Sequence, residues 1–288
     1  MTDEAIDVLV VAYGAPELLD ECLGAVGRSF PVTVVDNSSS PEVRTVSERH
    51  GASYLDPGSN LGFAAGVNVG LAHRAAATGD VLLLNPDAVI DGAGVIGLHR
   101  MLHSRPDLAA VAPEQVDPVD GARARVDWPF PTPGGAWMEA VGAGRFRRGD
   151  EFMIGSVLLL RADALAEVGG FDERFFLYAE ETDWQRRARD LGWRMAPCPE
   201  VVATHVGAGT GGDSVERDIH FHASTERYVR KHFGATGWWV FRTGVMAGAL
   251  VRALALPGDR HRRAARQFHL YRAGPLRAES RLAATAGA

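Results

Sequence analysis

Short apolar runs alternate with helix-like segments along the first two thirds of the chain. The runs IDVLVVAY, VTVVD and DVLLL have the length and the β-branched content of buried strands. Helical spacing is seen between them in Pro16–Val26, Glu42–Arg49 and NLGFAAGVNVGLAHRAAATG, and a short edge strand is expected at ASYLD. This alternation predicts an α/β fold with a mainly parallel sheet flanked by helices, and ligands beyond the carboxyl ends of the strands.

The pattern breaks down between Asp117 and Asp150, where proline, glycine and arginine predominate. A loop system is expected here, since long loops in compact domains commonly bind ligands or act as lids. Alternation returns in FMIGSVLLLRADALAEVGGFDERFF, which predicts a strand, a helix and a turn. A helix over Ala179–Leu191 follows, and WRMAPCPEVVATHVG predicts two short strands that bracket prolines.

The tail from Tyr228 onward differs from the rest. Its segment GWWVFRTGVMAGALVRALAL approaches the length of a membrane span, but Arg242 and Arg252 interrupt it. A central arginine costs about 2.5–3.5 kcal/mol on insertion, so a spanning helix is not expected. The composition fits either a helix lying in a membrane interface or an amphipathic helix packed on the body. Two parts are therefore expected, residues 1–227 and a basic, amphipathic helical extension over residues 228–288.

Charge strengthens this division. The net charge is −6, yet the tail from Tyr228 carries eleven basic residues against two acids, a local +9, which leaves −15 for the preceding part. A basic tail favours an anionic surface as its partner, and an acidic body disfavours nucleic acid. Cys22 and Cys198 are far apart and do not indicate a disulfide framework, and the start of the chain lacks a secretory pattern, so a cytoplasmic location is expected.

The strongest candidate for chemistry is LLLNPDA, in which a buried strand ends at Asn85, Pro86 and Asp87. A carboxylate at the mouth of a parallel sheet can hold a divalent cation that binds a diphosphate. The same residues are also ordinary turn chemistry. Asp36, at the end of VVDNSSS, is placed to hydrogen-bond a ribose or base, or alternatively to cap the next turn. No G-x-G-x-x-G follows the first strand, which favours a mononucleotide over a dinucleotide.

Three glycines, Gly62, Gly66 and Gly70, recur at four-residue spacing on one helical face. Each costs about 1 kcal/mol relative to alanine in a helix, so something is expected to approach the backbone closely. Packing against a strand satisfies this requirement as well as a ligand does. Asn60 and Asn68 add polar groups that suit a phosphate or a sugar.

Acidic residues follow an aromatic run in RFFLYAEETDWQRR. Glu180, Glu181 and Asp183 have the setting in which a carboxylate gains the basicity that a general base needs. The alternative is an exposed acidic first turn stabilised by the helix dipole, with Asp183 paired to Arg187 four residues on. His205, among small residues in ATHVGAG, is either a metal ligand or a structural histidine.

Taken together, these motifs resemble those of family-2 glycosyltransferases with the GT-A fold, especially the bacterial rhamnosyltransferase-like branch. The resemblance covers about residues 6–232 and rests on VVAYGAPELLDECL, VVDNSS, NLGFAAGVNVG, LLLNPDA, GSVLLLRADALAEVGGFDERFFLYAEETDWQRRARDLGW and ATHVGAGT. It implies a GT-A catalytic domain over residues 1–227 with a nucleotide-binding sheet, followed by the helical extension.

The resemblance also assigns roles. Asp87 would contact a divalent metal, Mn²⁺ or Mg²⁺, with Asn85 in place of the first aspartate of a D-x-D motif, and His205 would complete the metal site. The acid pair falls on Glu180 and Glu181, with Glu181 as the base where an aspartate is usual, and Asp183 is a further catalytic candidate. Donor binding falls on residues at strand ends and the following helix: Ala12, Tyr13, Asp36, Asn37, Asn60, Gly62, Asn68, Asn85 and Asp87.

The function so implied is inverting, metal-dependent transfer of a sugar, with rhamnose suggested by the branch, from a dTDP- or UDP-sugar. The acceptor would be a glycan or lipid-linked saccharide in cell-envelope polysaccharide synthesis, on the inner face of the plasma membrane. Two alternatives remain. A sugar nucleotidyltransferase would require a glycine-rich basic loop after the first strand, which AYGAPELLD lacks. A nucleotide-sugar or glycan binding module would bind without turnover.

Overall fold

The computed structural model describes residues 6–75, 78–146, 149–206 and 214–286. The chain forms two compact units. The first comprises Met1–Trp128, Glu151–Phe176 and Glu180–Gly211, and the second comprises Pro129–Asp150, Leu177–Ala179 and Gly212–Ala288. The domain boundary expected at residue 227 remains a prediction, and the helix that begins at Ser214 continues across it.

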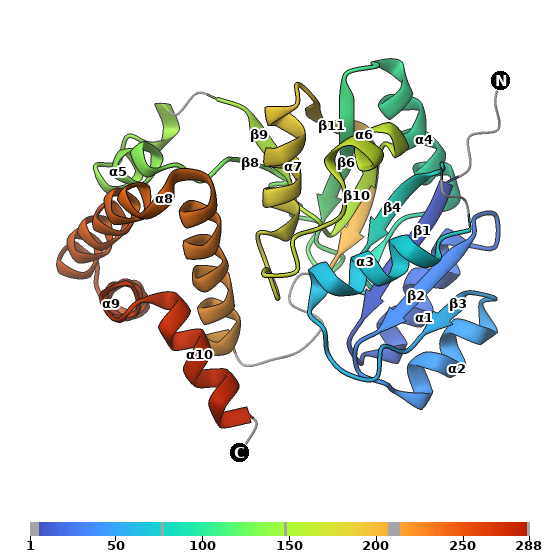
Figure 1. Cartoon of the computed structure of the whole chain (residues 1–288), viewed down its shortest axis with the longest axis horizontal. Coiled ribbons are helices and arrows are strands. Elements are labelled where there is room, and N and C mark those ends of the chain that lie inside the picture. Colours follow the sequence, from blue (N-terminus) through green and yellow to red (C-terminus); the bar gives the residue numbers. More distant parts are fainter. Residues whose placement is uncertain (1–5, 76–77, 147–148, 207–213, 287–288) are drawn as a thin grey trace. The chain divides into compact units, whose positions relative to one another are not determined.

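A nine-stranded sheet forms the centre of the first unit, in the order β3-β2-β1-β4-β10-β6-β11-β5, with β7 paired to β6 (Figure 1). Its strands are β1 (Ile6–Ala12), β2 (Val32–Asp36), β3 (Ser53–Leu55), β4 (Asp80–Leu84), β5 (Ala88–Val89), β6 (Leu108–Val116), β7 (Arg123–Ala124), β10 (Val157–Leu160) and β11 (Arg194–His205). A separate two-stranded sheet pairs β8 (Asp127–Pro129) with β9 (Glu151–Met153). Strands β1 to β4 are parallel, as predicted, whereas β10 runs antiparallel between β4 and β6.

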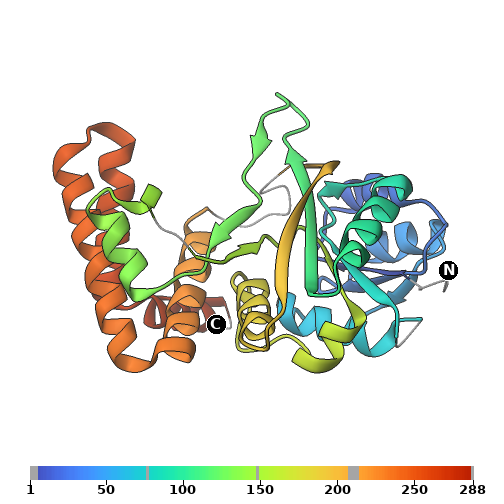
Figure 2. The ribbon, with the colours of Figure 1, turned by 90° about the horizontal axis from the view of Figure 1, so that it is seen from above.

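Helices cover both faces of this sheet, as Figure 2 shows. They are α1 (Pro16–Val26), α2 (Pro41–Arg49), α3 (Phe63–His73), α4 (Gly92–Ser104), α6 (Ala162–Val168) and α7 (Glu180–Asp190). Alternate residues of β1 serve the two faces: Val10 lies in one apolar cluster with Leu19 of α1, and Leu9 lies in the other with Val67 of α3. The predicted α/β fold, with helices on both sides of the sheet, is therefore confirmed.

Two local predictions were wrong. The segment expected to form two short strands is the single strand β11, whose register with β6 shifts between Cys198 and Val202. Prolines such as Pro199 are tolerated at an irregularity of this kind, and β11 pairs with β6 both before and after it. In the expected loop system, residues 133–140 form helix α5 (Pro133–Ala140). Thr132 caps it by accepting a hydrogen bond from the Gly135 amide at 3.0 Å, and Pro133 occupies the first turn.

The second unit is helical. It contains α5, the 3₁₀ turn η1 (Gly144–Phe146), α8 (Ser214–Ala255), α9 (Gly258–Ala273) and α10 (Pro275–Ala286). Helix α8 is kinked at Gly234, whose φ of 68° is non-helical. Arg242 donates hydrogen bonds to the carbonyls of Tyr271 at 2.8 Å and Arg272 at 2.9 Å, so it caps the end of α9. None of the described helices combines the length and apolarity of a membrane span.

Candidate active site

The turn after β4 holds Asp87 in a buried position. The Asn85 amide donates to the Ser156 carbonyl at 2.8 Å, and the Ala88 amide donates to the Asn85 carbonyl at 3.1 Å. The Asp87 side chain is 3% exposed, and its Oδ1 has no hydrogen-bond partner among the described residues. A buried carboxylate oxygen without a hydrogen bond is costly, so a positively charged neighbour or a ligand is expected beside this atom.

His205 lies beside this carboxylate. Strand β5 pairs antiparallel with β11 so that His205 is opposite Ala88, and the Val206 amide donates to the Asp87 carbonyl at 3.1 Å. His205 Nε2 is 3.3 Å from Asp87 Oδ1, and its side chain is 19% exposed. The structure thus brings together the two side chains expected to hold a metal. The remainder of the ATHVGAGT motif, residues 207–210, falls outside the described residues.

Glu180 and Glu181 begin α7, directly after two residues with left-handed backbone. Tyr178 and Ala179 have φ values of 67° and 64°, a conformation that costs non-glycine residues about 1–3 kcal/mol each. Such strain is concentrated at functional sites in proteins. Here it turns the chain so that both glutamates open the helix, and each has its Oε2 buried without a hydrogen-bond partner in the described part of the chain.

Glu181 packs against the backbone of Gly155. A Cβ added to Gly155 would lie 3.4 Å from Cβ and Cγ of Glu181, so the glutamate packs directly on this backbone. The next residue, Ser156, accepts the hydrogen bond from the Asn85 amide. The Gly155–Ser156 segment therefore connects Glu181 to the turn that carries Asp87.

Burial changes the acidity of both glutamates. It raises the pKa of Glu181 to about 7, although backbone hydrogen bonds at Glu181 and Thr182 oppose the shift. Burial, and then the charge of Glu181, raises the pKa of Glu180 well above its usual value. A carboxyl group with a pKa near neutrality can accept a proton at neutral pH and is a stronger base than an ordinary glutamate. The exposed acidic turn considered as an alternative is not observed, since Glu180 is buried.

Asp183, by contrast, has a structural partner. It is fully buried, and its Oδ2 accepts a hydrogen bond from Arg187 Nε at 3.0 Å. Arg187 also donates to the carbonyls of Val168 and Gly170, each at 2.7 Å. The pair therefore ties α7 to the turn after α6, and a catalytic role for Asp183 remains a prediction.

Asp36 is buried, and groups of the loop that follows it already donate hydrogen bonds to its carboxylate. Its carboxylate accepts hydrogen bonds from the Ser38 amide at 2.9 Å, the Ser40 amide at 2.7 Å and the Tyr54 hydroxyl at 2.8 Å. Burial, and then this bond to Asp36, raises the pKa of Tyr54 to about 12. The observed role matches the capping alternative, and direct contact of Asp36 with a nucleoside remains a prediction. Through Ser38, whose Oγ accepts from the Gly14 amide at 3.0 Å, Asp36 shapes the loop after β1.

Asn37 is hydrogen-bonded to two other predicted donor-binding positions, Ala12 and Gly62. Its backbone N–H donates to the Ala12 carbonyl at 2.9 Å, and its side-chain Nδ2 donates to the Gly62 carbonyl at 3.0 Å. Asn60 Oδ1 accepts from the Gly62 amide at 3.0 Å. Tyr13, at the end of β1, is 57% exposed and available to a ligand. These residues form a second polar group at the ends of β1 and β2.

The two groups share one edge of the sheet. Because β1 and β4 are parallel, with Leu9 opposite Leu83, the turn after Ala12 and the turn holding Asp87 both follow the carboxyl ends of neighbouring strands. Ligands of open α/β sheets bind at this edge. The predicted location of the site is therefore consistent with the observed topology.

The glycine stripe and Asn68 have packing roles. A Cβ on Gly70 would lie 2.1 Å from Leu9 Cδ1, and one on Gly66 would lie 2.8 Å from Val11 Cγ1, so β1 is what approaches α3 closely. Asn68 donates to the Phe171 carbonyl at 2.8 Å and accepts from the Phe171 amide at 2.8 Å. The strand-packing alternative accounts for Gly66 and Gly70, and donor binding by Asn68 remains a prediction. Gly62 does not belong to the helical stripe: it lies just before α3 with a φ of 81°, and a Cβ added to it would clash with the Phe176 carbonyl. Donor binding by Gly62 also remains a prediction.

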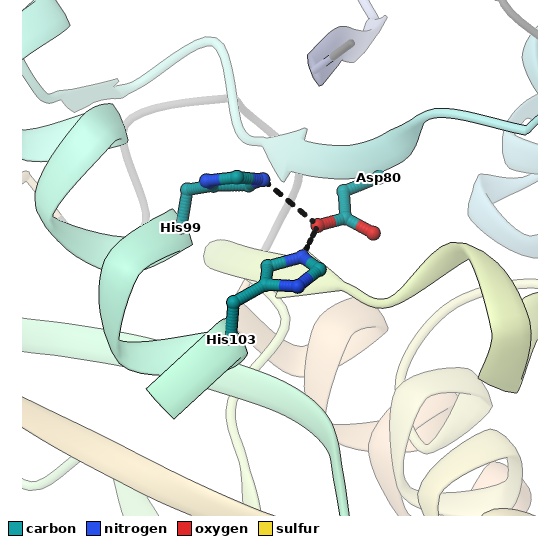
Figure 3. A group of neighbouring side chains, drawn as sticks. All are labelled: Asp80, His99 and His103. Atoms are coloured by element: carbon teal, nitrogen blue, oxygen red, sulfur yellow. Dashed lines mark hydrogen bonds and ion pairs between the residues drawn. The ribbon is translucent and has the colours of Figure 1, made fainter. Parts of the chain in front are cut away.

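Sequence reasoning missed one cluster. Asp80, His99 and His103 lie together at the opposite end of β4 and form a possible metal-binding group within the described residues (Figure 3). The available signal was the spacing of the two histidines, four residues apart on one face of a helix.

The sequence of this chain is similar to those of known glycosyltransferases. No protein-family model matches the chain. It is 28% identical over 273 residues to an N-acetylglucosaminyl-diphospho-decaprenol L-rhamnosyltransferase of Mycobacterium tuberculosis, covering 83% of this chain and 87% of that protein. It is 26% identical over 213 residues to a low-salt glycan biosynthesis hexosyltransferase of Haloferax volcanii, covering 69% of this chain and 66% of that protein.

Solved structures show the same fold. A mannosyltransferase from Pyrobaculum calidifontis, solved with GDP-Man and Mn²⁺, superposes with a TM-score of 0.58 at 16% identity and covers 96% of this chain and 82% of its own. S. aureus TarS superposes with a TM-score of 0.53 at 13% identity and covers 93% of this chain and 80% of its own. The resemblance indicated by the motifs is thus confirmed: this chain is a relative of the glycosyltransferases, with the GT-A fold and a sequence similar to that of a rhamnosyltransferase.

Proposed function

We propose that this protein transfers a sugar from a nucleoside-diphosphate donor to an acceptor hydroxyl, with inversion at the anomeric carbon. The observation that carries the proposal is the buried Asp87 Oδ1, which lacks a hydrogen bond among the described residues and lies 3.3 Å from His205 Nε2. In this proposal the Asn85–Asp87 turn and His205 hold the diphosphate end of the donor, and Glu181 faces the acceptor.

Asp87 and His205 are the residues that would hold a divalent metal. One carboxylate oxygen and one imidazole nitrogen suit Mn²⁺ better than Mg²⁺, which prefers oxygen ligands alone. A bound divalent ion supplies positive charge that stabilises a departing diphosphate. The mannosyltransferase from Pyrobaculum calidifontis was solved with such an ion, which supports the assignment.

Glu181 is the proposed general base. Its carboxylate would accept the proton of the acceptor hydroxyl while the new bond from oxygen to the anomeric carbon forms and the bond to the diphosphate breaks. Burial raises the pKa of Glu181 to about 7, which makes its carboxylate a stronger base than that of an ordinary glutamate. Asn85 and Asn37 would position the donor, and Tyr13 would lie against the base.

The donor and acceptor follow from the relatives. The Mycobacterium tuberculosis protein is named for transfer of L-rhamnose to a diphospho-decaprenol-linked N-acetylglucosamine. We extend this to a dTDP- or UDP-sugar as donor, with rhamnose the first to test, and to a lipid-linked saccharide as acceptor in cell-envelope synthesis. Access to such a lipid would require contact with the inner face of the plasma membrane, which we assign to the basic helices of the second unit.

The experiment is a transfer assay with purified protein, Mn²⁺, a panel of nucleotide sugars and lipid-linked acceptor. We expect nucleoside diphosphate release and glycosylated product for one donor, with both abolished in Asp87→Asn and Glu181→Gln variants that keep the wild-type circular dichroism spectrum. Metal-dependent donor binding without release of diphosphate for any donor would instead identify a binding module.

A further inference from the structure

A second polar group lies far from the candidate active site on the same strand. Asp80 is the first residue of β4, whereas Asp87 follows the last. At about 3.3 Å per residue, β4 separates the two ends by roughly 13 Å. The side chains around Asp80 therefore cannot bind the same ion as Asp87.

Three side chains converge at this opposite end. His103 Nε2 is 2.7 Å from Asp80 Oδ2, and His99 Nε2 is 3.5 Å from the same oxygen. One ligand atom from each residue lies within 4.8 Å of the other two. Figure 3 shows both rings directed from α4 toward the carboxylate at the start of β4.

The local fold fixes this arrangement. His103 is four positions after His99, so both project from the same face of α4. Leu98 and Leu102, on the adjoining face, are buried in the core. The Ala162 amide donates to Asp80 Oδ1 at 2.8 Å, and this leaves Oδ2 directed at the two imidazoles. A carboxylate held on one oxygen in this way resembles the oriented ligands of metal sites.

Access and charge both permit a cation. The Asp80 side chain is 3% exposed, whereas those of His99 and His103 are 20% and 27% exposed, so an ion can reach a buried negative charge from the solvent side. A buried carboxylate is strongly disfavoured unless a cation compensates it. The neighbouring cation, Arg161, is committed elsewhere: it donates to the carbonyls of Leu102, Arg105 and Leu108.

The structural alternative to a metal site involves Arg161, whose Nη1 lies 3.4 Å from His103 Nδ1. A purely structural network would use this contact to hold the imidazole between Arg161 and Asp80. At 3.4 Å it is a weak hydrogen bond at best, and the three carbonyls satisfy the guanidinium without it. The two interpretations therefore differ in whether His103 Nε2 and His99 Nε2 share an ion with Asp80.

We propose that Asp80, His99 and His103 bind a divalent transition metal that joins α4 to the first residue of β4. Two imidazoles and one carboxylate match the ligands of Zn²⁺, and three protein ligands leave a fourth tetrahedral position for water. This site is independent of the proposed transferase chemistry and would stabilise the first unit.

The test uses the full-length protein, stripped of metal with a chelator and titrated with Co²⁺ as a spectroscopic probe for Zn²⁺. We expect visible d–d bands typical of tetrahedral coordination in wild type, and the same bands in the matched control Asp87→Asn, which removes the other candidate metal site. His99→Gln and His103→Gln should each weaken Co²⁺ and Zn²⁺ binding at least tenfold. Retention of wild-type affinity in both histidine variants, or absence of the bands in wild type, would overturn the proposal.

A second measurement guards against histidine variants that fail to fold. X-ray absorption at the zinc edge of Zn²⁺-loaded Asp87→Asn, which lacks the other candidate metal site, should show nitrogen and oxygen ligands with the multiple scattering of two imidazoles. A spectrum with one imidazole or none, or with sulfur ligands, would contradict the assignment without use of a histidine variant.

Discussion

At the level of single residues, the buried acids of the candidate site differ in whether their oxygens have hydrogen-bond partners among the described residues. Asp36 and Asp183 are both buried, but each is satisfied, the first by amides and a hydroxyl and the second by Arg187. Asp87 and Glu181 each keep a buried oxygen without a hydrogen bond among the described residues. Unsatisfied buried acids are expected where a ligand or a proton completes the site.

The pKa of Glu181 makes a prediction about stability. In the unfolded chain this carboxyl titrates near its usual value of about 4.3, whereas in the fold its pKa is raised to about 7. The folded protein therefore binds the extra proton between these values, and its stability falls as pH rises through this window. Glu181→Gln should be more stable than wild type at pH 8 and no more stable below pH 4, as measured by urea unfolding.

The matched control is Glu17→Gln, which alters an exposed acid in the first turn of α1. It removes the same type of charge from the surface, and so it separates the effect of burying a carboxyl group from that of removing one. An identical pH dependence in wild type and Glu181→Gln would show that Glu181 is not raised in the folded state.

Asp183 should behave as a stability residue. Asp183→Asn leaves Arg187 without its ionic partner, and breaking a buried pair costs about 3–5 kcal/mol, less here because the Arg187 side chain is 25% exposed. We expect a loss of about 2–3 kcal/mol in the free energy of unfolding, with residual transfer activity in the folded fraction. Full stability together with complete loss of activity would instead assign Asp183 to catalysis.

At the level of elements, pairing between strands far apart in sequence determines which side chains meet at the candidate site. The pairing of β5 with β11 places His205 beside Asp87, although the two residues are far apart in sequence. Sequence periodicity predicted strands β1 to β4, helices α1, α2, α3, α6 and α7, and the edge of the sheet where polar residues gather. It did not predict strand β6 or helix α4. It did not reveal the antiparallel β10 or the approach of His99 to Asp80, because pairing between distant segments leaves no local pattern. Helix α5 was missed because its Pro-Gly-Gly start reads as a loop.

Packing of α3 on β1 can be tested at its glycines. An alanine Cβ at Gly70 would lie 2.1 Å from Leu9 Cδ1, and Leu9 is buried with little room to move. Overpacking costs about 1–3 kcal/mol, which exceeds the gain from replacing a helical glycine. Gly70→Ala should therefore lower the melting temperature.

Gly24→Ala in α1 is the matched control. Its added Cβ would meet only His50 Cε1, at an ordinary 3.7 Å, so this variant should gain up to about 1 kcal/mol from helix propensity. Equal melting temperatures for the two variants would contradict close packing at Gly70.

At the level of the whole molecule, charge is unevenly distributed along the chain. The part before Tyr228 carries −15 and the tail +9. Within the second unit, α8 exposes Trp239 and Leu254, and the first half of α9 exposes Arg260 and Arg263. Exposed apolar side chains together with exposed arginines are typical of a helical surface that contacts anionic lipid.

This surface predicts lipid-dependent binding. The full-length protein should sediment with vesicles containing phosphatidylglycerol and not with phosphatidylcholine vesicles, and salt should weaken the binding. Each arginine near such a surface contributes about 1 kcal/mol, so replacing Arg260 and Arg263 with serine should weaken binding roughly 25-fold. Equal binding to neutral and anionic vesicles would refute an electrostatic contact.

We propose that Asp87 and His205 together hold the metal that binds the donor diphosphate. Calorimetry should measure binding of the nucleotide sugar that supports transfer, with and without Mn²⁺, in wild type, Asp87→Asn and His205→Gln. We expect Mn²⁺ to tighten binding at least tenfold in wild type and to have almost no effect in either variant. An equal Mn²⁺ effect in all three proteins would show that Asp87 and His205 do not hold this metal.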